Sequence, residues 1–175
     1  MKWAIDLSHS QIQFAVKHLG ISTVRGTFDQ FEGTIEEENG HVLSATVDID
    51  VASINTGNAQ RDGHLRSGEL FHVAEFPKAS FNLTSFSKSG EDVTAVGELT
   101  LLGISHPVTL RGELNGPVKD PWGNQKVSAS LTTVISRKVW GLVYNGVLET
   151  GGLMLSDEIK MTIEVQAAAL VEAAV

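Results

Sequence analysis

The residues best suited to chemistry gather in one segment of this chain, between Asn55 and Pro77. Residues 61–66 read Arg-Asp-Gly-His-Leu-Arg, which brings opposite charges and an imidazole close together. An arginine here, or Arg137 farther along, is suited to an anionic or carbonyl group on a ligand. The structural alternative pairs Asp62 with an arginine to anchor the segment. Both roles are compatible, since an insertion that caps a cavity must also be anchored.

The 6 histidines do not form a recognisable local metal site. His9 and His18, and also His64 and His72, are too far apart in sequence for a short ligand motif, and no HExxH occurs. A site built from distant residues stays open as an alternative. The other interpretation makes His18 an inward-facing polar group. No metal or other cofactor is therefore predicted.

The sequence also offers no strong signal for catalysis. Ser8-His9-Ser10 brings hydroxyls beside an imidazole, but neighbouring strand residues point to opposite faces, so direct activation is not expected. The G-x-S-x-G elbow, the G-x-G-x-x-G loop and the Walker A pattern are missing, and the chain has 0 cysteines. We predict no catalytic residues.

Composition favours one globular domain. The formal net charge of -8 argues against a nucleic-acid partner, which needs clustered Lys and Arg. No stretch approaches the roughly 18 apolar residues of a membrane span, so the protein is not expected to be membrane-integral. The first residues carry no apolar leader, so the expected location is cytoplasmic, or periplasmic if a leader has been removed.

Alternating apolar residues dominate the chain. Residues 12–18, 45–51, 79–83, 95–101, 108–114, 127–131 and 159–165 all repeat with period two. This period is typical of antiparallel strands with one hidden face, and Asn39-Gly40 is a strong hairpin signal. Strands joined by short turns predict an all-β antiparallel barrel of about eight strands. Phe86 and Val134 break the period, which predicts bulges there.

Two segments interrupt the strands. Residues 57–72 fit a short helical insertion, for which Asn55, Thr56 or Asn58 is a candidate cap. Residues 136–152 are predicted to form a loop or short helical turn. Glycines within the strand patterns indicate either bends of the barrel or room for a ligand inside it; these are Gly26, Gly33, Gly97 and Gly112.

Several motifs follow one another in the chain: FAVKHLGISTVRGTF at 14–28, RDGHLRS at 61–67, GELTLLG at 97–103, PVTL at 107–110, DPWG at 120–123, SRKVWGL at 136–142 and ETGG at 149–152. In this order they resemble the YceI-like family, over about residues 3–167. Two residues depart from the family pattern: His72 stands where an acidic residue is expected, and Trp140 replaces a phenylalanine. The second change is expected to alter the shape of the cavity.

The resemblance implies a lipocalin-like barrel around an elongated apolar cavity. Such proteins bind polyisoprenoid chains, isoprenoid quinones or related fatty amides, often as homodimers, and no catalytic residue carries over. We therefore expect residues 1–168 to form a single domain, with a peripheral tail at 169–175. The expected function is carriage or storage of a long-chain isoprenoid or related lipid. The alternatives are an enzyme that acts on a cavity-bound lipid, and a ligand-free stress-response or interaction module.

Candidate ligand-binding residues follow from the inward faces and the insertion. The expected apolar wall consists of Phe14, Val16, Phe28, Val47, Ile49, Phe81, Leu83, Leu99, Leu101, Leu110, Leu131 and Trp140. The expected polar mouth consists of His18, Arg61, His64 and Arg137.

Overall fold

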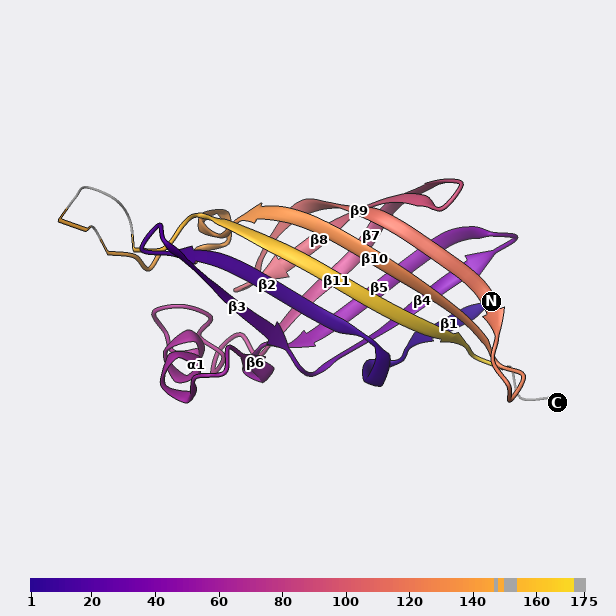
Figure 1. The fold of residues 1–175 in the computed structure, drawn as a ribbon, viewed down its shortest axis with the longest axis horizontal. Helices are drawn as coiled ribbons and strands as arrows, with labels where there is room; N and C mark the ends of the chain where they lie inside the picture. Colours follow the sequence, from indigo (N-terminus) through magenta and orange to yellow (C-terminus); the bar gives the residue numbers. More distant parts are fainter. Residues whose placement is uncertain (147, 150–153, 172–175) are drawn as a thin grey trace.

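A computed structural model describes residues 1–146, 148–149 and 154–171 as a long barrel of antiparallel strands (Figure 1). Part of the ETGG motif, at 150–152, lies outside the described residues. The strands are β1 (Lys2–Ile5), β2 (Gln11–His18), β3 (Ser22–Phe28), β4 (Phe31–Glu38), β5 (His41–Asp50), β6 (Ile54–Asn55), β7 (Lys78–Ser89), β8 (Asp92–Leu101), β9 (Ile104–Lys119), β10 (Gln125–Ser136) and β11 (Glu158–Ala169). The helical elements are α1 (Ala59–Arg66) and the 3-10 turns η1 (Leu7–His9), η2 (Val51–Ser53) and η3 (Arg137–Trp140).

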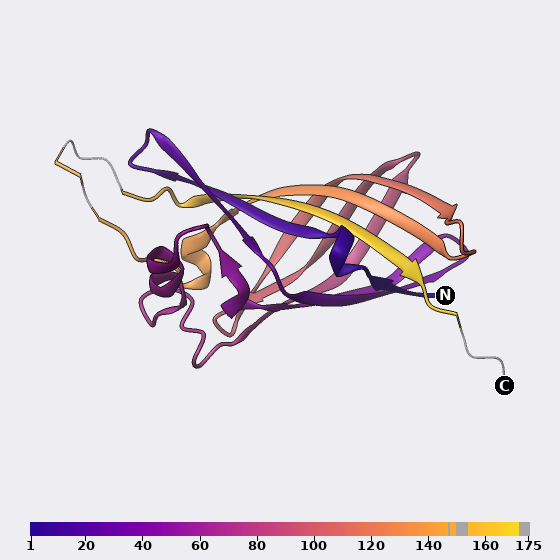
Figure 2. The same cartoon turned by 60° about the horizontal axis from the view of Figure 1, so that its bottom comes forward.

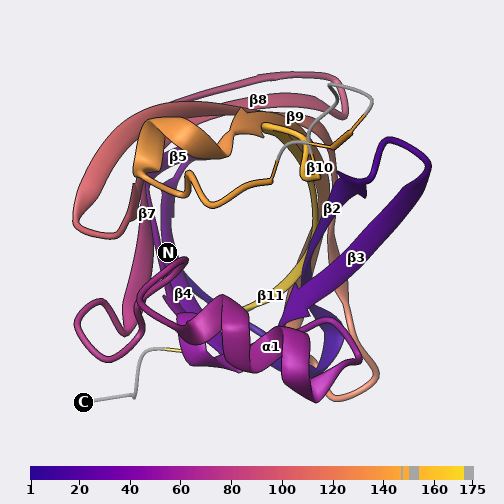
Figure 3. The ribbon, with the colours of Figure 1, turned by 90° about the vertical axis from the view of Figure 1, so that its left-hand side faces the viewer.

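Eight strands close into a ring. Their order is β1-β4-β5-β7-β8-β9-β10-β11, and β1 pairs with β11 to complete the circle. Seen end-on, the ring has α1 at its near rim (Figure 3). The predicted antiparallel barrel of about eight strands is thus confirmed. Closure leaves few open edges, because each strand of the ring has a neighbour on both sides.

The β2–β3 hairpin extends the wall beyond the ring. β2 pairs with the first part of β11, and β6 pairs with the end of β3. This hairpin lies at the same end of the molecule as α1, whereas the N-terminus lies at the other end (Figures 1 and 2). One end of the barrel therefore carries both α1 and the turn of the β2–β3 hairpin.

The two expected bulges have different outcomes. The register of β7 against β8 shifts between Leu83 and Ser85, which turns Phe86 to the half-buried face opposite Ala95. Val134 instead pairs with Lys160 without a shift and is 57% exposed. The predicted bulge at Val134 is wrong, because that side chain simply stays on the outer face.

The predicted helical insertion is confirmed as α1, and Asn58 is its cap. The Asn58 side chain accepts a hydrogen bond from Arg61 N at 3.0 Å, which satisfies a backbone donor of the first turn. The sequence could not choose among three candidate caps because each of them has a side chain that can accept this bond.

Thr56, rather than an arginine, anchors Asp62. The buried Asp62 carboxylate accepts from Thr56 N at 3.0 Å and from Thr56 Oγ1 at 2.5 Å. Arg61 Nε in turn donates to Thr56 Oγ1 at 2.7 Å, and Arg61 Nη2 donates to Thr56 O at 2.8 Å. The predicted Asp62–arginine pair is therefore wrong: both charged side chains meet at the same threonine.

The strand glycines mark places where the protein itself fills the space above the sheet. A Cβ on Gly26 would collide with the Phe14 ring, and one on Gly97 would collide with the Phe81 ring. A Cβ on Gly112 would instead meet the backbone of β10 at Ser130. At these three positions neighbouring side chains and strands, not a ligand, occupy the room that the missing side chains leave.

The buried core lies toward the insertion end of the barrel. One buried cluster contains Phe28 of β3, Phe31 of β4, Ile49 of β5, Val51 of η2 and Ile54 of β6. Leu65 and Phe71 of the insertion pack against it. The insertion therefore shares its hydrophobic core with the strands.

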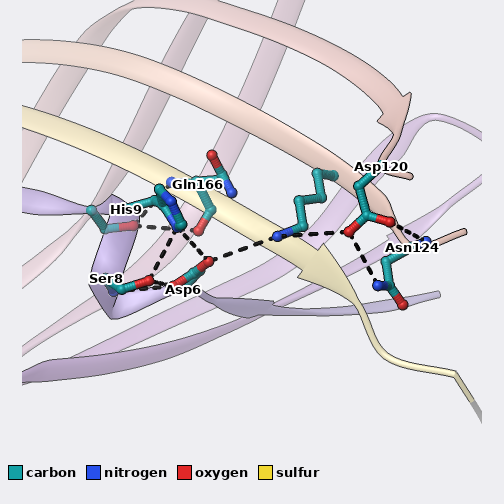
Figure 4. Close-up of polar contacts among 8 residues, drawn as sticks. Asp6, Ser8, His9, Asp120, Asn124 and Gln166 are labelled. Atoms are coloured by element: carbon teal, nitrogen blue, oxygen red, sulfur yellow. Dashed lines mark hydrogen bonds and ion pairs between the residues drawn. The ribbon is translucent and has the colours of Figure 1, made fainter. Parts of the chain in front are cut away.

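Polar contacts tie elements together toward the terminal end (Figure 4). Asp6 caps η1 and accepts from Ser8 Oγ at 2.6 Å, while Lys126 lies 3.9 Å from both Asp6 Oδ2 and Asp120 Oδ2. The hydrogen bond from Ser8, followed by that from His9, lowers the pKa of Asp6 to about 2. At the C-terminus, β11 includes Ala169, and Leu170 N donates to Lys2 O, so part of the expected tail is integrated into the fold.

Candidate ligand cavity

An apolar cavity of about 300 Å³ lies where the barrel meets the insertion. Residues from β2, β3, β5, β6, β7, β8, β10 and β11 form its wall, and the insertion around α1, η3 and the residues Leu142, Tyr144, Met154 and Leu155 contribute the rest. An engineered cavity of about 150 Å³ holds one benzene. By that comparison, this cavity as it stands holds roughly a dozen carbon atoms.

The structure brings together half of the expected apolar wall. The expected residues that line the cavity are Phe14, Val16, Phe28, Ile49, Leu99 and Leu101. All four expected polar residues also line it: His18, Arg61, His64 and Arg137. Residues far apart in sequence therefore meet at one place, although strand alternation alone says nothing of position along the barrel axis.

The other expected wall residues lie elsewhere. Those outside the cavity are Val47, Phe81, Leu83, Leu110, Leu131 and Trp140. Val47 packs against the buried core cluster, and Phe81 covers Gly97. Leu110 pairs with Ala95, and Leu131 pairs with Gly112 and Ile163. Apart from Trp140, which belongs to η3, these residues lie at strand positions farther from α1, so an inward side chain is not sufficient to reach the cavity.

Sequence reasoning missed much of the lining. The additional residues are Val24, Ile54, Thr56, Leu65, Leu70, Phe71, Ala79, Ile135, Leu142, Tyr144, Met154, Leu155, Ile159 and Met161. Val24, Ile159 and Met161 follow the same alternation as the chosen residues and could have been found by it. Leu142, Tyr144 and Leu155 lie in segments without a period, so no pattern marked them.

His64 and Arg61 form the more solvated side of the mouth. His64 Nε2 lies 2.6 Å from Glu69 Oε2, and its ring meets the Tyr144 ring edge-on with centroids 4.7 Å apart. Arg61 is exposed and held by Thr56. His18 ends β2 and forms an isolated bridge with Leu155. This side can present hydrogen-bonding groups to a ligand without burying a charge.

Arg137 is the one charged residue among these four that is fully buried, at 4% exposure. Its Nε donates to Ser156 O at 2.9 Å, and its Nη1 donates to Leu142 O at 2.5 Å and to Tyr144 O at 2.9 Å. Nη2 is buried and has no hydrogen-bond partner among the described residues. Burial lowers the pKa of Arg137, and the negative charge of Asp157 partly opposes that effect.

Trp140 belongs to a second hollow, on the outside of the barrel. β9 pairs with β10 only between Arg111–Lys119 and Gln125–Thr132, and a hollow of about 650 Å³ lies where the two strands separate. Trp140 lines it and is buried against His106, while its Nε1 donates to Leu99 O at 2.9 Å. This hollow includes the exposed Val134 and Val139, so it is a surface feature. Trp140 therefore does not line the cavity itself but bonds to Leu99, which does.

The Ser8–His9 pair differs from its expected geometry without forming a catalytic relay. Residues 7–9 form η1 instead of a strand, so Ser8 Oγ lies 3.1 Å from His9 Nδ1. Asp6 Oδ2 contacts the same nitrogen at 2.8 Å. A serine triad needs the acid and the hydroxyl on opposite ring nitrogens, so this exposed cluster caps a turn.

Within the described ranges, no group of three His, Asp or Glu side chains is placed to hold a metal ion. In the same residues, no helix is long and apolar enough to cross a membrane.

Comparison with known proteins gives a consistent result. The model of the YceI-like domain matches residues 3–167. A UPF0312 protein of Staphylococcus aureus (strain USA300) is 40% identical over 161 residues, covering 90% of this chain and 92% of that protein. The crystal structure of Campylobacter jejuni YCEI protein is 31% identical, with a TM-score of 0.77 and coverage of 89% and 90% of the two chains. A polyisoprenoid binding domain from Saccharophagus degradans, described as implicated in plant cell wall breakdown, shares the fold at 18% identity, with a TM-score of 0.75 and coverage of 96% and 98%.

Proposed function

Because the chain belongs to the YceI-like domain family, we propose that it binds an isoprenoid or related long-chain lipid in the cavity at the insertion end. The observation that carries this proposal is the cavity itself, whose wall is almost entirely aliphatic and aromatic. Such a wall binds water only weakly, whereas each methylene group of a ligand that is buried there contributes roughly 0.8 kcal/mol to the binding free energy. A chain can therefore bind without polar recognition of its tail.

The polar residues fit one end of such a ligand. Ligand pockets commonly combine an apolar wall with a few polar groups that fix orientation. Arg61, His64 and Arg137 come from the insertion and from η3, at the end where α1 covers the barrel. The proposed orientation places the head group among these residues and the tail along β2, β8 and β11. A chain longer than roughly a dozen carbons needs side-chain movement or a protruding end.

Titration of delipidated protein tests this proposal. Prenyl quinones, prenyl phosphates and long fatty amides would be added while tryptophan fluorescence is followed. Trp140 donates to a cavity-lining residue and should respond, whereas Trp122 is 84% exposed. A Trp122→Phe variant removes this solvent-exposed background. Saturable binding is expected for at least one class, and its absence for all three would contradict the proposal.

The biological setting is part of the same proposal. Carriage or storage of the lipid, rather than its conversion, is the role we favour, because the family resemblance supplies binding and no catalytic residues. A homodimer is the expected assembly on the same ground. Sedimentation equilibrium checks this expectation, and a monomer at all concentrations would contradict it.

A lipid-converting enzyme is the second candidate, favoured by one observation. The His64–Glu69 contact of 2.6 Å at the mouth has the form of an oriented acid–base pair. Under this alternative His64 or His18 would transfer a proton to or from a bound lipid. Replacing both histidines separates the two candidates, as described in the Discussion.

A further inference from the structure

The buried guanidinium of Arg137 has no carboxylate in direct contact among the described residues. None of the ion pairs in the described part of the chain includes it. The nearby Asp157 is engaged elsewhere: its Oδ2 accepts from Ser136 Oγ at 2.5 Å, and its Oδ1 accepts from Lys138 N at 3.2 Å. The guanidinium therefore bonds directly to three main-chain carbonyls, and the negative charge of Asp157 acts on it only from a longer distance.

The hydrogen-bond inventory of Arg137 is also incomplete. A guanidinium has five N–H donors. Nε and Nη1 use theirs on Ser156 O, Leu142 O and Tyr144 O, which leaves both donors of Nη2. Buried polar groups are almost always paired, and a buried charge is costly unless it is compensated. An oxygen acceptor from outside the protein would complete this site.

The position of Arg137 in the cavity indicates which kind of molecule carries the oxygen acceptor. Arg137 lines the same cavity as Phe14, Leu99 and Met161, so an occupant that reaches Nη2 also meets the apolar wall. The carbonyl oxygens that hold the guanidinium belong to Leu142, Tyr144 and Ser156, and they fix its position in the cavity wall. The chemistry that matches both features is an acyl or prenyl tail that ends in an oxygen atom.

We propose that Arg137 selects lipids with an anionic head group, a carboxylate or a phosphate, over neutral lipids with the same tail. This inference rests on the proposed lipid binding. An anion compensates the buried charge and accepts from both Nη2 hydrogens, whereas a hydroxyl offers the hydrogen bond alone. Arg61 is exposed, so its contribution to anion binding would be screened by salt, unlike that of Arg137.

The test compares farnesyl phosphate with farnesol on delipidated protein. Farnesyl phosphate should bind about tenfold more tightly than farnesol, a difference of about 1.4 kcal/mol. The preference should persist in high salt because the charge is buried. Equal affinities in the native protein, or a preference that disappears in high salt, would overturn the inference. Failure of both ligands to bind would instead overturn the proposed function.

Two variants test whether Arg137 causes the preference for farnesyl phosphate over farnesol. Arg137→Gln should bind both ligands with the affinity that farnesol has for the native protein, and Lys138→Gln serves as the matched control. Lys138 is the next residue, is exposed, and carries the same charge. If Arg137→Gln does not fold by circular dichroism, the salt dependence in the native protein still decides. A preference that survives in folded Arg137→Gln contradicts the inference.

Inorganic phosphate distinguishes a lipid site from a site for free anions. The tail supplies much of the affinity, so inorganic phosphate at equal concentration should not displace farnesyl phosphate. Displacement at comparable concentrations would mean that a free anion is the occupant, and this would contradict selection of a lipid head group.

Discussion

The ring of Phe14 on β2 lies directly over Gly26 on β3. The two residues are register partners, and a Cβ on Gly26 would fall inside the phenyl ring's van der Waals envelope. Phe14 also packs against Phe28, with ring centroids 5.6 Å apart, and both rings line the cavity. Because Gly26 has no side chain, the Phe14 ring can lie over it, and this contact sets how far the ring projects into the cavity.

Gly26→Ala should displace Phe14 and narrow the cavity. The added methyl group also approaches Thr56 Cγ2 at 2.9 Å, so neither neighbour can relax freely. Overpacking of this kind typically costs about 1–3 kcal/mol. Urea unfolding measures the free-energy loss, and lipid titration should show weaker binding. Gly63→Ala is the control, since nothing lies within 4 Å of a Cβ there.

The double variant Phe14→Leu/Gly26→Ala extends the same prediction. A shorter side chain at position 14 vacates the space that the new methyl group needs. The two substitutions should therefore be less damaging together than the sum of their separate effects. Strict additivity would show that the Phe14–Gly26 contact does not set the shape of this wall.

Thr56→Val should loosen α1 from the barrel. Valine keeps the shape but removes the hydroxyl that bonds Asp62 and Arg61. Asp62 is 6% exposed, so its carboxylate is left underbonded, at a cost of about 1–3 kcal/mol. Hydrogen exchange should show faster opening of residues 59–66.

Thr56→Ser is the matched control because it retains the hydroxyl. Its α1 amides should exchange at nearly the native rate. If valine and serine at position 56 protect α1 equally, the hydroxyl network is not what anchors the insertion.

Asp6→Asn should change the acid sensitivity of folding. The folded-state pKa of Asp6 is lowered to about 2 from 3.8 by Ser8 first and then by His9. Its charge therefore stabilises the fold fully above about pH 4, and this contribution is lost as pH falls toward 2. Asparagine still caps η1, so the variant should lose about 1 kcal/mol or less at neutral pH, because the carboxylate is partly exposed and solvent screens its charge.

Thermal unfolding as a function of pH checks this prediction. The gap in Tm between native protein and Asp6→Asn should be largest near neutrality and should close by about pH 2. A gap that stays constant over this range would mean that the charge of Asp6 does not contribute.

Replacing His18 and His64 by Gln together should leave the affinity for a lipid tail nearly unchanged. Both residues line the mouth, but the binding energy of the tail comes from the apolar wall. A neutral alkane or prenyl hydrocarbon is the appropriate probe, since it has no head group. Loss of a lipid-converting turnover in this variant would support the enzymatic alternative instead.

The sequence predicted the fold more fully than the site, for physical reasons. Alternation over many segments specifies which face of each strand is buried, and this was enough to predict a closed antiparallel barrel. Alternation does not specify the position of a residue along the barrel axis. It therefore predicts Leu83, Leu131 and Val16 as parts of one cavity wall, although only Val16 reaches the cavity. Tyr144 and Leu155 lie in aperiodic segments, where position depends on tertiary contacts.

The sequence indicates which charged residues lie in or near the site, but it does not predict the groups to which they hydrogen-bond. Asp62 is expected to meet an arginine, but the structure pairs it with Thr56, which offers both N–H and O–H donors. Arg137 was a candidate for the mouth, yet only the structure reveals that three carbonyl groups hold it and that Nη2 is unpaired among the described residues. Local sequence does not show which carbonyl groups elsewhere in the fold accept hydrogen bonds from a given side chain.

Mass spectrometry of organic extracts from freshly purified protein tests the central claim most directly. Native protein and Lys17→Trp should each release a stoichiometric lipid, because Lys17 is exposed on the outer face of β2. Val16→Trp, one residue away, fills the cavity and should release little or none. A native protein that yields no lipid, or a Val16→Trp variant that yields as much as the native protein, would contradict a lipid-binding cavity at this site.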